Sequence, residues 1–525
     1  MWLITFALVG VFYFYWNFIR PLNTWKNYGI PYIKGWPLVG NFLKNALKRE
    51  SFGDAVISMY KAFPNEPYCG SFVFSAPRLL IRDANLLKDI GIKDFDHFTD
   101  HTKIFFGDGF DPIFDKNLFS LDGQNWRDMR ATLSPAFTGS KMRGIFVLMN
   151  ECGNQLVNYL NDKIKAENNQ KHLELELKDL FTRFTNDIIA TTAFGIKVDS
   201  LKEPENKFYL MGREVTYFST FRFFLMNFIP TIMRLLNIGV LSKAACDYFR
   251  NLVFQTISMR ETQKIVRPDM LNILLQAKNG LLKNDDKGDD NGGFAAATEG
   301  KVGGKIRKLT DEDVTAQAFI FFLAGFDTVS TAMCFIVYEL ALNPDIQERL
   351  YSEINDALDG NPNAEVTYET LHKMKYLDMI ISESLRKWPP AVFIDRECTK
   401  PYRLKANNGK EIMIPTDMGI VIPIMGIHRD PKYYPNPEKF DPERFSDENK
   451  SKINMNAYLP FGVGPRVCIG SRFALMETKI LIVHLIRNFE VILTSKSTVP
   501  PRLSTQSSNM AIENGFNVGL KPRNF

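Results

Sequence analysis

The sequence lacks the cysteine pattern of a disulfide scaffold or a zinc-binding module. Its 525 residues contain 6 cysteines, which are widely spaced, and no two of them form a CxxC pair. They are Cys69, Cys152, Cys246, Cys334, Cys398 and Cys468. Domains that depend on disulfide bonds need a denser and shorter pattern. We therefore expect reduced thiols and chemistry that faces the cytosol, with a specific task for at least one thiol.

The composition also excludes several broad classes of protein. Charged residues make up 23% and hydrophobic residues 45% of the chain, so it is neither disordered nor a polytopic membrane protein. The formal net charge is only +5, too small an excess of Lys and Arg to predict binding to nucleic acid. Phenylalanine is abundant, with 43 copies, which indicates a large apolar interior that has room for an apolar cavity.

The N-terminal run is long and uncharged enough to cross a membrane. Residues 2–19 carry no charge and reach about the minimum length for a ~30 Å hydrocarbon core. A cleaved signal peptide would need a basic segment first and small residues at a cleavage site, and the run has neither. Aromatic residues near its ends favour an interfacial anchor over a buried helix: Trp2, Tyr13, Tyr15 and Trp16. Because basic residues follow from Arg20 onward, the positive-inside rule predicts one transmembrane anchor at residues 1–20 and a cytosolic body.

The remainder divides into a short strap and one large body. The prolines and glycines of residues 21–44 predict a stiff, non-helical strap. Residues 45–525 show mostly helical spacing of apolar residues, with short β-like runs at residues 72–82 and 411–424. Residues 278–308 are rich in Gly, Asp, Asn and Lys, and predict a surface loop.

Two further apolar segments follow. Polar and basic residues interrupt residues 217–240, which argues against a second membrane span. That segment predicts amphipathic helices that touch the bilayer surface or roof a cavity, and a core helix is the alternative. Residues 311–342 predict one long helix, which begins at a capping-box-like pair, Thr310 and Asp313, and stops before Pro344.

The strongest signal in the chain is a glycine-rich loop with a single cysteine. It reads FGVGPRVCIG from Phe461 to Gly470. A nucleotide-binding GxGxxG does not fit, because Val467 takes the third glycine position and Pro465 would disturb the helix start. The glycines instead let the backbone approach a flat ligand closely.

Cys468 stands just before a predicted helix at residues 472–488. Amide donors and the helix dipole at such a position favour a thiolate, and Arg466 adds positive charge for the thiolate or for an anionic group of the ligand. A lone thiolate with no neighbouring Cys or His suits axial ligation of haem iron better than zinc. The alternative, a small buried cysteine, fits the surrounding glycines and arginine less well.

The loop resembles the haem-binding signature of the cytochrome P-450 superfamily at every defining position. These are Phe461, Gly462, Gly464, Arg466, Cys468 and Gly470. Further motifs follow in the family's order, so the resemblance covers nearly the whole chain. It implies a mainly α fold with a long central helix over haem b, small β-sheets, and Cys468 as the iron ligand, in addition to the N-terminal transmembrane helix. Residues 36–40 and 462–477 are similar to insect microsomal members, especially the ninth family.

The long helix carries polar residues in an apolar centre. Asp327 and Thr328 are costly there unless they are used or paired, and a Thr328 hydroxyl that bonds back to its own helix is the alternative. Ala324-Gly325-x-Asp327-Thr328 resembles the oxygen-activation motif of the family. The resemblance implies that Thr328 donates a hydrogen bond to dioxygen and that Asp327 relays protons. Gly325 would let the haem or oxygen approach the helix.

Four cationic or aromatic residues match propionate-binding positions of the family. Trp126 and Arg130 lie at i and i+4, so that their side chains point the same way. A core tryptophan with a surface arginine is the alternative. With Arg396 and Arg466, the resemblance implies charge-assisted bonds to the two haem propionates.

A second group of residues matches a structural network of the family. Glu383 and Arg386 form an ExxR pair on one helix face, which alone indicates only a solvated ion pair. Together with Arg444 they resemble the buried Glu/Arg/Arg network that supports the haem pocket. We expect His428 to be a satisfied structural histidine and not a ligand.

The motifs together predict a monooxygenase that combines O2 with a small lipophilic substrate, such as an insecticide, a plant toxin or an endogenous lipid. No flavin domain fits into residues 471–525, so an NADPH-dependent flavoprotein reductase is the implied partner, on the endoplasmic reticulum membrane. Basic residues near the cysteine loop would form its docking surface: Lys141, Arg143 and Lys479.

The expected substrate pocket is apolar and aromatic, lined by residues 104–119, 218–228, 319–322 and 391–393. Two alternatives to a monooxygenase stay open. One is a haem-thiolate isomerase or dehydratase, and the other is a non-catalytic haem-binding carrier or sensor. Neither needs a proton relay, so the Asp327–Thr328 pair argues against both.

Overall fold

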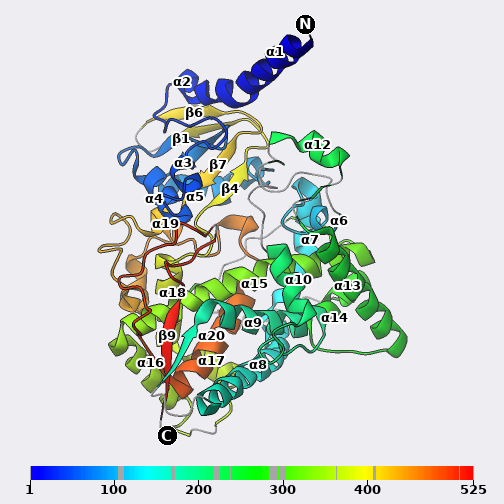
Figure 1. The fold of residues 1–525 in the computed structure, drawn as a ribbon, viewed down its shortest axis with the longest axis vertical. Helices are drawn as coiled ribbons and strands as arrows, with labels where there is room; N and C mark the ends of the chain where they lie inside the picture. Colours follow the sequence, from blue (N-terminus) through cyan, green and yellow to red (C-terminus); the bar gives the residue numbers. More distant parts are fainter. Residues whose placement is uncertain are drawn as a thin grey trace.

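The computed structural model describes residues 2–103, 112–166, 172–216, 225, 228–236, 238–239, 241–282, 294–295, 303–361, 364–405, 409–507 and 509–523. Helices dominate the fold and the sheets are small, as the sequence predicted. The N-terminal helix projects from one end of the molecule, beside the larger β-sheet, and the C-terminus lies at the opposite end (Figure 1).

The helices are α1 (Trp2–Phe14), α2 (Thr24–Tyr28), α3 (Leu43–Ala46), α4 (Phe52–Lys61), α5 (Ala84–Lys88), α6 (Pro112–Asp115), α7 (Gly123–Leu133), α8 (Gly139–Ala166), α9 (Leu177–Ile189), α10 (Lys207–Thr216), α12 (Pro230–Leu235), α13 (Lys243–Gln263), α14 (Met270–Lys278), α15 (Asp311–Leu342), α16 (Pro344–Ala357), α17 (Tyr368–Lys373), α18 (Lys375–Lys387), α19 (Ile424–His428) and α20 (Ser471–Asn488). The strands are β1 (Tyr68–Val73), β2 (Ala76–Ile81), β3 (Leu173–Glu176), β4 (Ile394–Glu397), β5 (Tyr402–Lys405), β6 (Glu411–Ile414), β7 (Gly419–Ile422), β8 (Phe489–Ile492) and β9 (Asn517–Pro522).

The strands form three separate sheets. In the 4-stranded sheet the order is β1-β2-β7-β4, with a parallel β2–β7 pair between antiparallel pairs. The 3-stranded sheet has the order β3-β9-β8, and β5 pairs with β6. Both β-like runs of the sequence therefore contain a turn: residues 72–82 join β1 to β2, and residues 411–424 hold β6 and β7. Strand β4 brings Arg396 into the larger sheet, next to the site described below.

The N-terminal helical run is longer than the sequence predicted. Every side chain of α1 is exposed, and short helical turns at Tyr15–Ile19 and Arg20–Asn23 continue the run into α2. The whole run, Trp2–Tyr28, is long and apolar enough to cross a membrane, and it passes residue 20, where we placed the end of the anchor. It reaches the body at Trp25, whose buried indole N–H donates to the Ser71 carbonyl over 2.9 Å.

The strap is non-helical from Gly29 to Phe42 and lies against β1. Isolated bridges join Tyr32 to Gly70 and Gly40 to Val73. Gly40 has a φ of +60°, and a Cβ there would lie 2.4 Å from the Phe72 carbonyl oxygen, so only glycine fits this close approach. The strap therefore holds the anchor firmly on the sheet.

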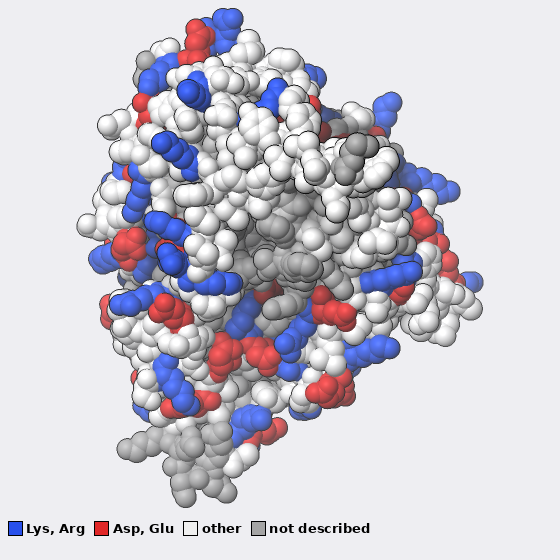
Figure 2. All heavy atoms as spheres, turned by 45° about the horizontal axis from the view of Figure 1, so that its top comes forward, with Lys and Arg blue, Asp and Glu red and all other residues white. Residues whose placement is uncertain are grey.

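Most of residues 217–240 lies outside the described residues, but the described part lies beside the anchor. The ring of Phe228 is 5.0 Å from that of Phe18, and the Tyr13 hydroxyl donates to the Phe228 carbonyl over 3.1 Å. Helix α12 carries exposed Ile232 and Leu235 at the same end of the molecule as α1 (Figure 1). Uncharged residues form a broad area on the face that Figure 2 shows at this end, with charged side chains toward its edges.

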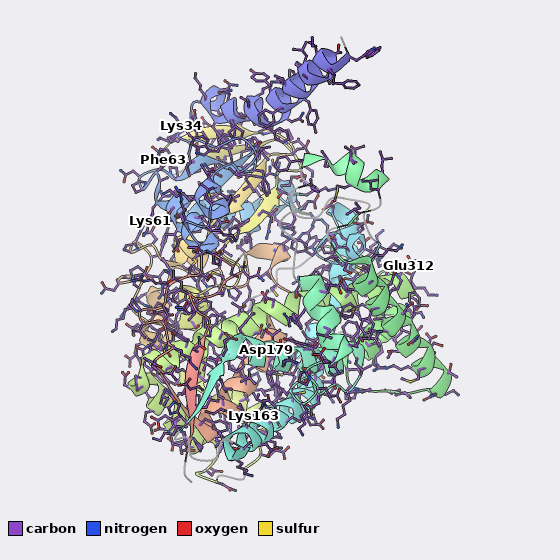
Figure 3. The ribbon with its side chains drawn as sticks, in the orientation of Figure 1. Lys34, Lys61, Phe63, Lys163, Asp179 and Glu312 are labelled. Carbon is purple, nitrogen blue, oxygen red and sulfur yellow. The ribbon has the colours of Figure 1, made fainter. Side chains whose placement is uncertain are left out.

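Helix α15 has the bounds that the sequence predicted and crosses the body. The hydroxyl oxygen of Thr310 accepts from the Asp313 backbone N–H over 3.1 Å, and the Asp313 carboxylate accepts from the Thr310 N–H over 2.9 Å, which completes the capping box. Glu312, labelled in Figure 3, marks its first turn. The helix is apolar enough to span a membrane, but most of its side chains are buried by neighbouring helices, so it is a core helix.

The Glu383–Arg386 pair is wholly buried and fixes the chain that leads to the cysteine loop. The carboxylate of Glu383 accepts from Arg386 Nε over 2.7 Å and from Nη2 over 2.8 Å. It also accepts from the Asp441 backbone N–H over 2.9 Å and faces Arg444 Nε at 3.4 Å. The network that the resemblance implied is therefore present, and it joins α18 to the segment around Asp441.

His428 connects this network to the cysteine loop. Its Nε2 accepts from the Leu459 backbone N–H over 2.8 Å, and its Nδ1 lies 3.1 Å from the Arg386 carbonyl oxygen. Because Nε2 is the acceptor, Nδ1 carries the proton and donates. Burial, with a smaller contribution from the nearby Arg386 charge, lowers the pKa of His428 to about 3. The ring is neutral and both of its nitrogens are satisfied, as expected of a structural histidine.

Replacement of Glu383 by Gln should destabilise the protein severely. The Arg386 guanidinium would then be buried without a counter-charge, which costs about 3–5 kcal/mol. The free energy of unfolding, measured by urea denaturation of the purified protein, is the quantity to compare with the unsubstituted protein.

Glu443→Gln is the matched control, because Glu443 also pairs with an arginine, Arg349, but with side chains that are 46% and 57% exposed. An exposed pair contributes less than about 1 kcal/mol. Equal losses in the two variants would contradict a supporting role for the buried network.

Candidate functional site

The cysteine loop is a tight turn that presents one thiol. Gly462 has a φ of +92° and Gly464 a φ of +70°, conformations that side chains with a Cβ rarely adopt. A Cβ on Gly464 would lie 1.6 Å from the Gly91 carbonyl oxygen. The Cys468 N–H donates to the Phe461 carbonyl over 2.9 Å, which closes the loop. Cys468 is exposed, whereas the other five cysteines are buried.

Helix α20 begins at Ser471, directly after Gly470, within one residue of the predicted start. Cys468 thus stands just ahead of a helix N-terminus, where unsatisfied amides and the helix dipole favour a negative charge. In the described part of the chain, no three His, Cys, Asp or Glu side chains are grouped to hold a metal ion. A lone thiol of this kind would suit a metal that is already held within a cofactor.

Two buried arginines from other elements donate to the backbone of this loop. Arg130 of α7 is 3% exposed, and its Nη1 donates to the Val467 carbonyl over 2.8 Å, next to Cys468. Arg396 of β4 is 1% exposed, and its Nη2 donates to the Val463 carbonyl over 3.3 Å. The residues that were predicted to bind the propionates thus meet at this loop. Their spacing along the chain does not by itself predict this.

The third arginine belongs to the loop itself and points away toward a neighbouring segment. Arg466 Nε donates to the Thr99 carbonyl over 2.7 Å, and Nη2 donates to the Leu121 carbonyl over 2.7 Å. Its guanidinium carbon lies 4.3 Å from the ring centre of Trp126, which is fully buried. The Trp126 ring therefore supports Arg466. The alternative, a core tryptophan beside a surface arginine, is wrong for Arg130, because Arg130 is buried.

Two of these arginines, Arg396 and Arg466, are cations that are buried close to each other. Burial lowers the pKa of Arg396 to about 10 and that of Arg466 to about 9, the latter with a contribution from the repulsion between the two cations. Arg466 forms an ion pair with Asp100 at 3.5 Å, and the carboxylates of Asp122 and Asp395 also favour its charge. Buried Arg396 Nε has no hydrogen-bond partner among the described residues. A bound anionic group would supply the acceptor that Arg396 Nε lacks.

These observations fit a haem on Cys468. The exposed thiol of Cys468 would bind the iron, and the glycine loop would let a flat ring approach. The unpartnered Nε of Arg396 suits a ligand with carboxylate groups. Ala324 and Thr328, one turn apart at the centre of α15, are exposed although most of that helix is buried. This open face at mid-helix leaves space for a ligand beside Ala324 and Thr328.

Thr328 adopts the alternative that the sequence left open. Its hydroxyl donates to the Ala324 carbonyl over 2.6 Å, within its own helix. The hydroxyl oxygen keeps its acceptor capacity, and a rotation about χ1 frees the proton for another partner. The exposed position fits the implied contact with dioxygen, but the hydrogen bond to dioxygen itself stays a prediction.

Asp327 lies beside Thr328 and is held by other helices and loops. Its Oδ1 is 2.8 Å from Lys178 Nζ of α9, and its Oδ2 accepts from Asn509 Nδ2 over 3.1 Å. Gly325 has a different role from the one we expected. A Cβ there would lie 3.0 Å from Ile189 Cδ1, so this glycine allows α9 to pack closely on α15, and the approach of a ligand is not its evident purpose.

The predicted pocket segments divide into three groups. Residues 104–111 and most of 218–228 lie outside the described residues. Phe319 and Phe322 are fully buried, with rings 5.6 and 4.8 Å from Phe249, so they belong to a phenylalanine core and not to a pocket wall. Phe393 is partly buried beside Phe52, at 5.8 Å between ring centres, and remains a candidate for the pocket.

One polar cluster next to the arginines was not predicted from the sequence. The Asp395 carboxylate lies 3.1 Å from His101 Nδ1 and accepts from both the backbone N–H and the hydroxyl of Thr102 over 2.6 Å. Burial alone would raise the pKa of Asp395, but these hydrogen bonds and the histidine lower it below its usual range. The partners are almost 300 residues apart in sequence, so no local pattern points to them.

The predicted docking surface needs one correction. Lys479 is 2% exposed and forms an ion pair with Asp378 at 2.6 Å, because α20 is buried on all sides at this point, so it cannot contact a partner. Arg143 is 63% exposed beside Glu369, and Lys141 is half-buried on the same first turn of α8.

Comparison with known proteins gives consistent matches over the whole chain. A family model described as Cytochrome P450 matches residues 30–518. Cytochrome P450 9e2 of Blattella germanica is 46% identical over 539 residues, which cover 100% of this chain and 98% of that protein. Probable cytochrome P450 9f2 of Drosophila melanogaster is 39% identical over 529 residues, 99% of this chain and 98% of its own. Cytochrome P450 6k1 of Blattella germanica is 37% identical over 506 residues, 94% of this chain and 91% of its own. The resemblance to insect members of the ninth family is thereby confirmed.

Proposed function

The chain belongs to the cytochrome P450 family and is a haem-thiolate monooxygenase, and we propose that it acts on lipophilic compounds at the endoplasmic reticulum membrane. The proposal includes haem b as the cofactor and an NADPH-dependent flavoprotein reductase as the electron donor. We assign the helical run Trp2–Tyr28 to the anchor, residues 29–44 to the strap and residues 45–525 to the catalytic domain, so the boundary between anchor and strap moves from residue 20 to residue 28. The observation that carries the proposal is the convergence of Arg130 and Arg396 on the loop of exposed Cys468.

When bound, the haem supplies the activation of dioxygen, which hydroxylates the substrate and yields water. The chain contributes the surroundings of that chemistry. Cys468 provides the thiolate, and the amides ahead of α20 stabilise its charge. Arg396 and Arg130 bind the carboxylates of the cofactor, with Trp126 and Arg466 behind them. Thr328 and Asp327 hold and pass protons on the side of α15, and apolar walls exclude water from the substrate.

The substrate class follows from the apolar surroundings and the membrane anchor. The exposed apolar helix Trp2–Tyr28 and the exposed apolar residues of α12 lie at one end of the molecule, which supports delivery of substrates that dissolve in the bilayer. Insecticides, plant toxins and endogenous lipids share this property. The Asp327–Thr328 pair supports a monooxygenase over an isomerase, a dehydratase or a carrier, none of which needs a proton relay.

Labelled oxygen tests the proposed reaction. Purified protein, a flavoprotein reductase, NADPH and a lipophilic alkyl-aryl probe are incubated under ¹⁸O2. We expect one labelled atom in the hydroxylated product and the other in water, at no more than one product per NADPH, because RH + O2 + NADPH + H⁺ gives ROH + H2O + NADP⁺. Product formation that needs neither O2 nor NADPH would support the isomerase, and binding without any product would support the carrier.

We also propose that the first turn of α8 docks the reductase. Arg143 is exposed, and Lys141 precedes it by two residues. Arg472, at the start of α20, donates to the Phe137 carbonyl just before α8, so this turn lies near the cysteine loop. The double variant Lys141→Glu/Arg143→Glu should reduce NADPH-supported turnover several-fold and leave peroxide-supported turnover unchanged. Lys163→Glu, at the other end of α8, is the matched control (Figure 3). Equal loss with both electron sources, or the same loss in the control, would contradict the docking site.

A further inference from the structure

A buried glutamine of α15 binds the chain that joins α6 to α7. Gln317 is fully buried. Its Oε1 accepts from the Leu118 backbone N–H over 2.9 Å, and its Nε2 donates to the Lys116 carbonyl over 2.9 Å. One side-chain amide therefore satisfies a backbone donor and a backbone acceptor of the same short stretch of chain. We call residues 116–121 the bridging segment.

The bridging segment has a fixed shape of its own. The side-chain oxygen of Asn117 accepts from the backbone N–H groups of Phe119 and Ser120 over 2.9 and 3.0 Å. The Asn117 carbonyl accepts from the N–H groups of Ser120 and Leu121 over 3.2 and 3.1 Å. A turn that is bonded in this way moves as a unit, so a contact at Leu118 also fixes the position of Phe119.

The two ends of the bridging segment contact different parts of the site. Lys116 forms an ion pair with Glu312 in the first turn of α15, which Figure 3 labels. At the other end, Arg466 of the cysteine loop donates from Nη2 to the Leu121 carbonyl over 2.7 Å, and its Nη1 lies 3.4 Å from the Phe119 carbonyl oxygen. The bridging segment therefore joins the long helix to the loop that carries the thiol.

Gln317 lies on the face of α15 that is open at mid-helix. Ala324 follows it by two helical turns, so the two side chains project in the same direction, about 10 Å apart along the axis. Ala324 and Thr328 are exposed, whereas Gln317 is covered by the bridging segment, and α6 packs on the same helix. The bridging segment thus closes one end of the open face.

Phe119 is the large apolar side chain that the bridging segment leaves exposed. It is 41% exposed, whereas Leu118 is buried. Its ring stacks on His101, with 4.5 Å between ring centres, and His101 is bonded to Asp395, next to Arg396 in the chain. The ring therefore lies beside the arginines of the site, on a segment whose position Gln317 fixes.

We propose that Gln317 is a positioning residue that holds the bridging segment, and with it the Phe119 ring, as a wall of the substrate pocket, and so determines which carbon of a lipophilic substrate is oxidised. The proposal rests on the proposed monooxygenase function. Reacting atoms must lie about 3–3.5 Å apart, so a small shift of a wall changes which carbon is in reach. Oxidation at either carbon follows RH + O2 + 2e⁻ + 2H⁺ to ROH + H2O. Only the ratio of the products depends on Gln317.

The test replaces Gln317 by Met, which has a similar volume but makes neither hydrogen bond. Amide hydrogen–deuterium exchange of residues 116–121 should become about tenfold faster, because Leu118 N–H loses its acceptor and the turn opens more often. With para-pentyltoluene as the probe, the ratio of oxidation at the methyl group to oxidation along the pentyl chain should change at least about threefold. The total rate of product formation should stay within about twofold, because the thiol and the Asp327–Thr328 pair are untouched.

Gln347→Met is the matched control. Gln347 of α16 is also buried, and its Nε2 donates to the Leu340 and Val491 carbonyls over 3.0 and 2.9 Å while its Oε1 accepts from the Val491 N–H over 2.8 Å. The control therefore loses the same kind of contact at a different place. We expect it to be destabilised to a similar extent, with unchanged exchange in residues 116–121 and an unchanged product ratio.

Phe119→Ala tests the same wall without a change in the core. It should alter the product ratio by itself, and Gln317→Met should cause no further change in the double variant, because both substitutions act on one wall. An unchanged ratio in Phe119→Ala, or independent effects of the two substitutions on the ratio, would overturn the proposal even if Gln317→Met alone failed to fold.

The remaining outcomes separate this proposal from the proposed function. If Gln317→Met speeds exchange but leaves the product ratio as it was, the glutamine has only a structural role and the proposal is wrong. The same holds if the Gln347→Met control changes the ratio equally. If the unsubstituted protein forms no product with NADPH and O2, the monooxygenase function itself fails, whereas the exchange measurement still reports on the contact of Gln317 with the bridging segment.

Discussion

The donation of buried arginine N–H groups to the backbone of the cysteine loop is the interaction on which the site depends. Arg130 reaches the Val467 carbonyl from α7, and Arg396 reaches the Val463 carbonyl from β4. A loop with two glycines at positive φ is entropically costly to order, and these charge-assisted bonds hold it from two sides. The carboxylates of Asp100, Asp122 and Asp395 lie near the buried arginines of the site, but the Nε of Arg396 has no acceptor among the described residues. A flat ligand with carboxylate groups, held at Cys468, would supply that acceptor.

Two further features of the fold surround that centre. On one side, the Glu383–Arg386 pair and His428 fix the chain just before Phe461, so that the approach to the loop is rigid. On the other side, α15 is buried along most of its length but leaves Ala324 and Thr328 exposed at mid-helix. The apolar helical run Trp2–Tyr28, long enough to cross a membrane, lies at the same end of the body as the exposed apolar residues of α12 (Figure 1). Rigidity near the thiol and an open face on α15 fit a haem-thiolate monooxygenase, and the apolar end of the molecule supports the proposal of lipophilic substrates.

The sequence predicted those features whose cause is local. The capping box at Thr310 and the Pro344 stop define α15 to the residue, and the FGVGPRVCIG run indicated both the turn and the helix after it. Features that depend on contacts between distant segments were missed or wrong. Lys479 was expected to be exposed because it is a lysine. Its burial with α20 and its ion pair with Asp378 result from tertiary packing, which the sequence does not reveal. Gly325 was expected to face a ligand, because a helical pattern does not reveal that Ile189 packs there. The Asp395–His101 cluster joins segments that no periodicity relates.

The central claim is that Cys468 binds haem iron as a thiolate, and the carbon monoxide difference spectrum of the dithionite-reduced protein tests it most directly. We expect the long-wavelength Soret band of a thiolate-ligated haem in the unsubstituted protein, and its disappearance in Cys468→Ala. Cys398→Ala, which removes a buried cysteine instead, should keep the band. A folded, unsubstituted protein that shows only the shorter-wavelength band of histidine or neutral thiol ligation, or a Cys468→Ala variant that keeps the long-wavelength band, would contradict the assignment of Cys468 and with it the monooxygenase function.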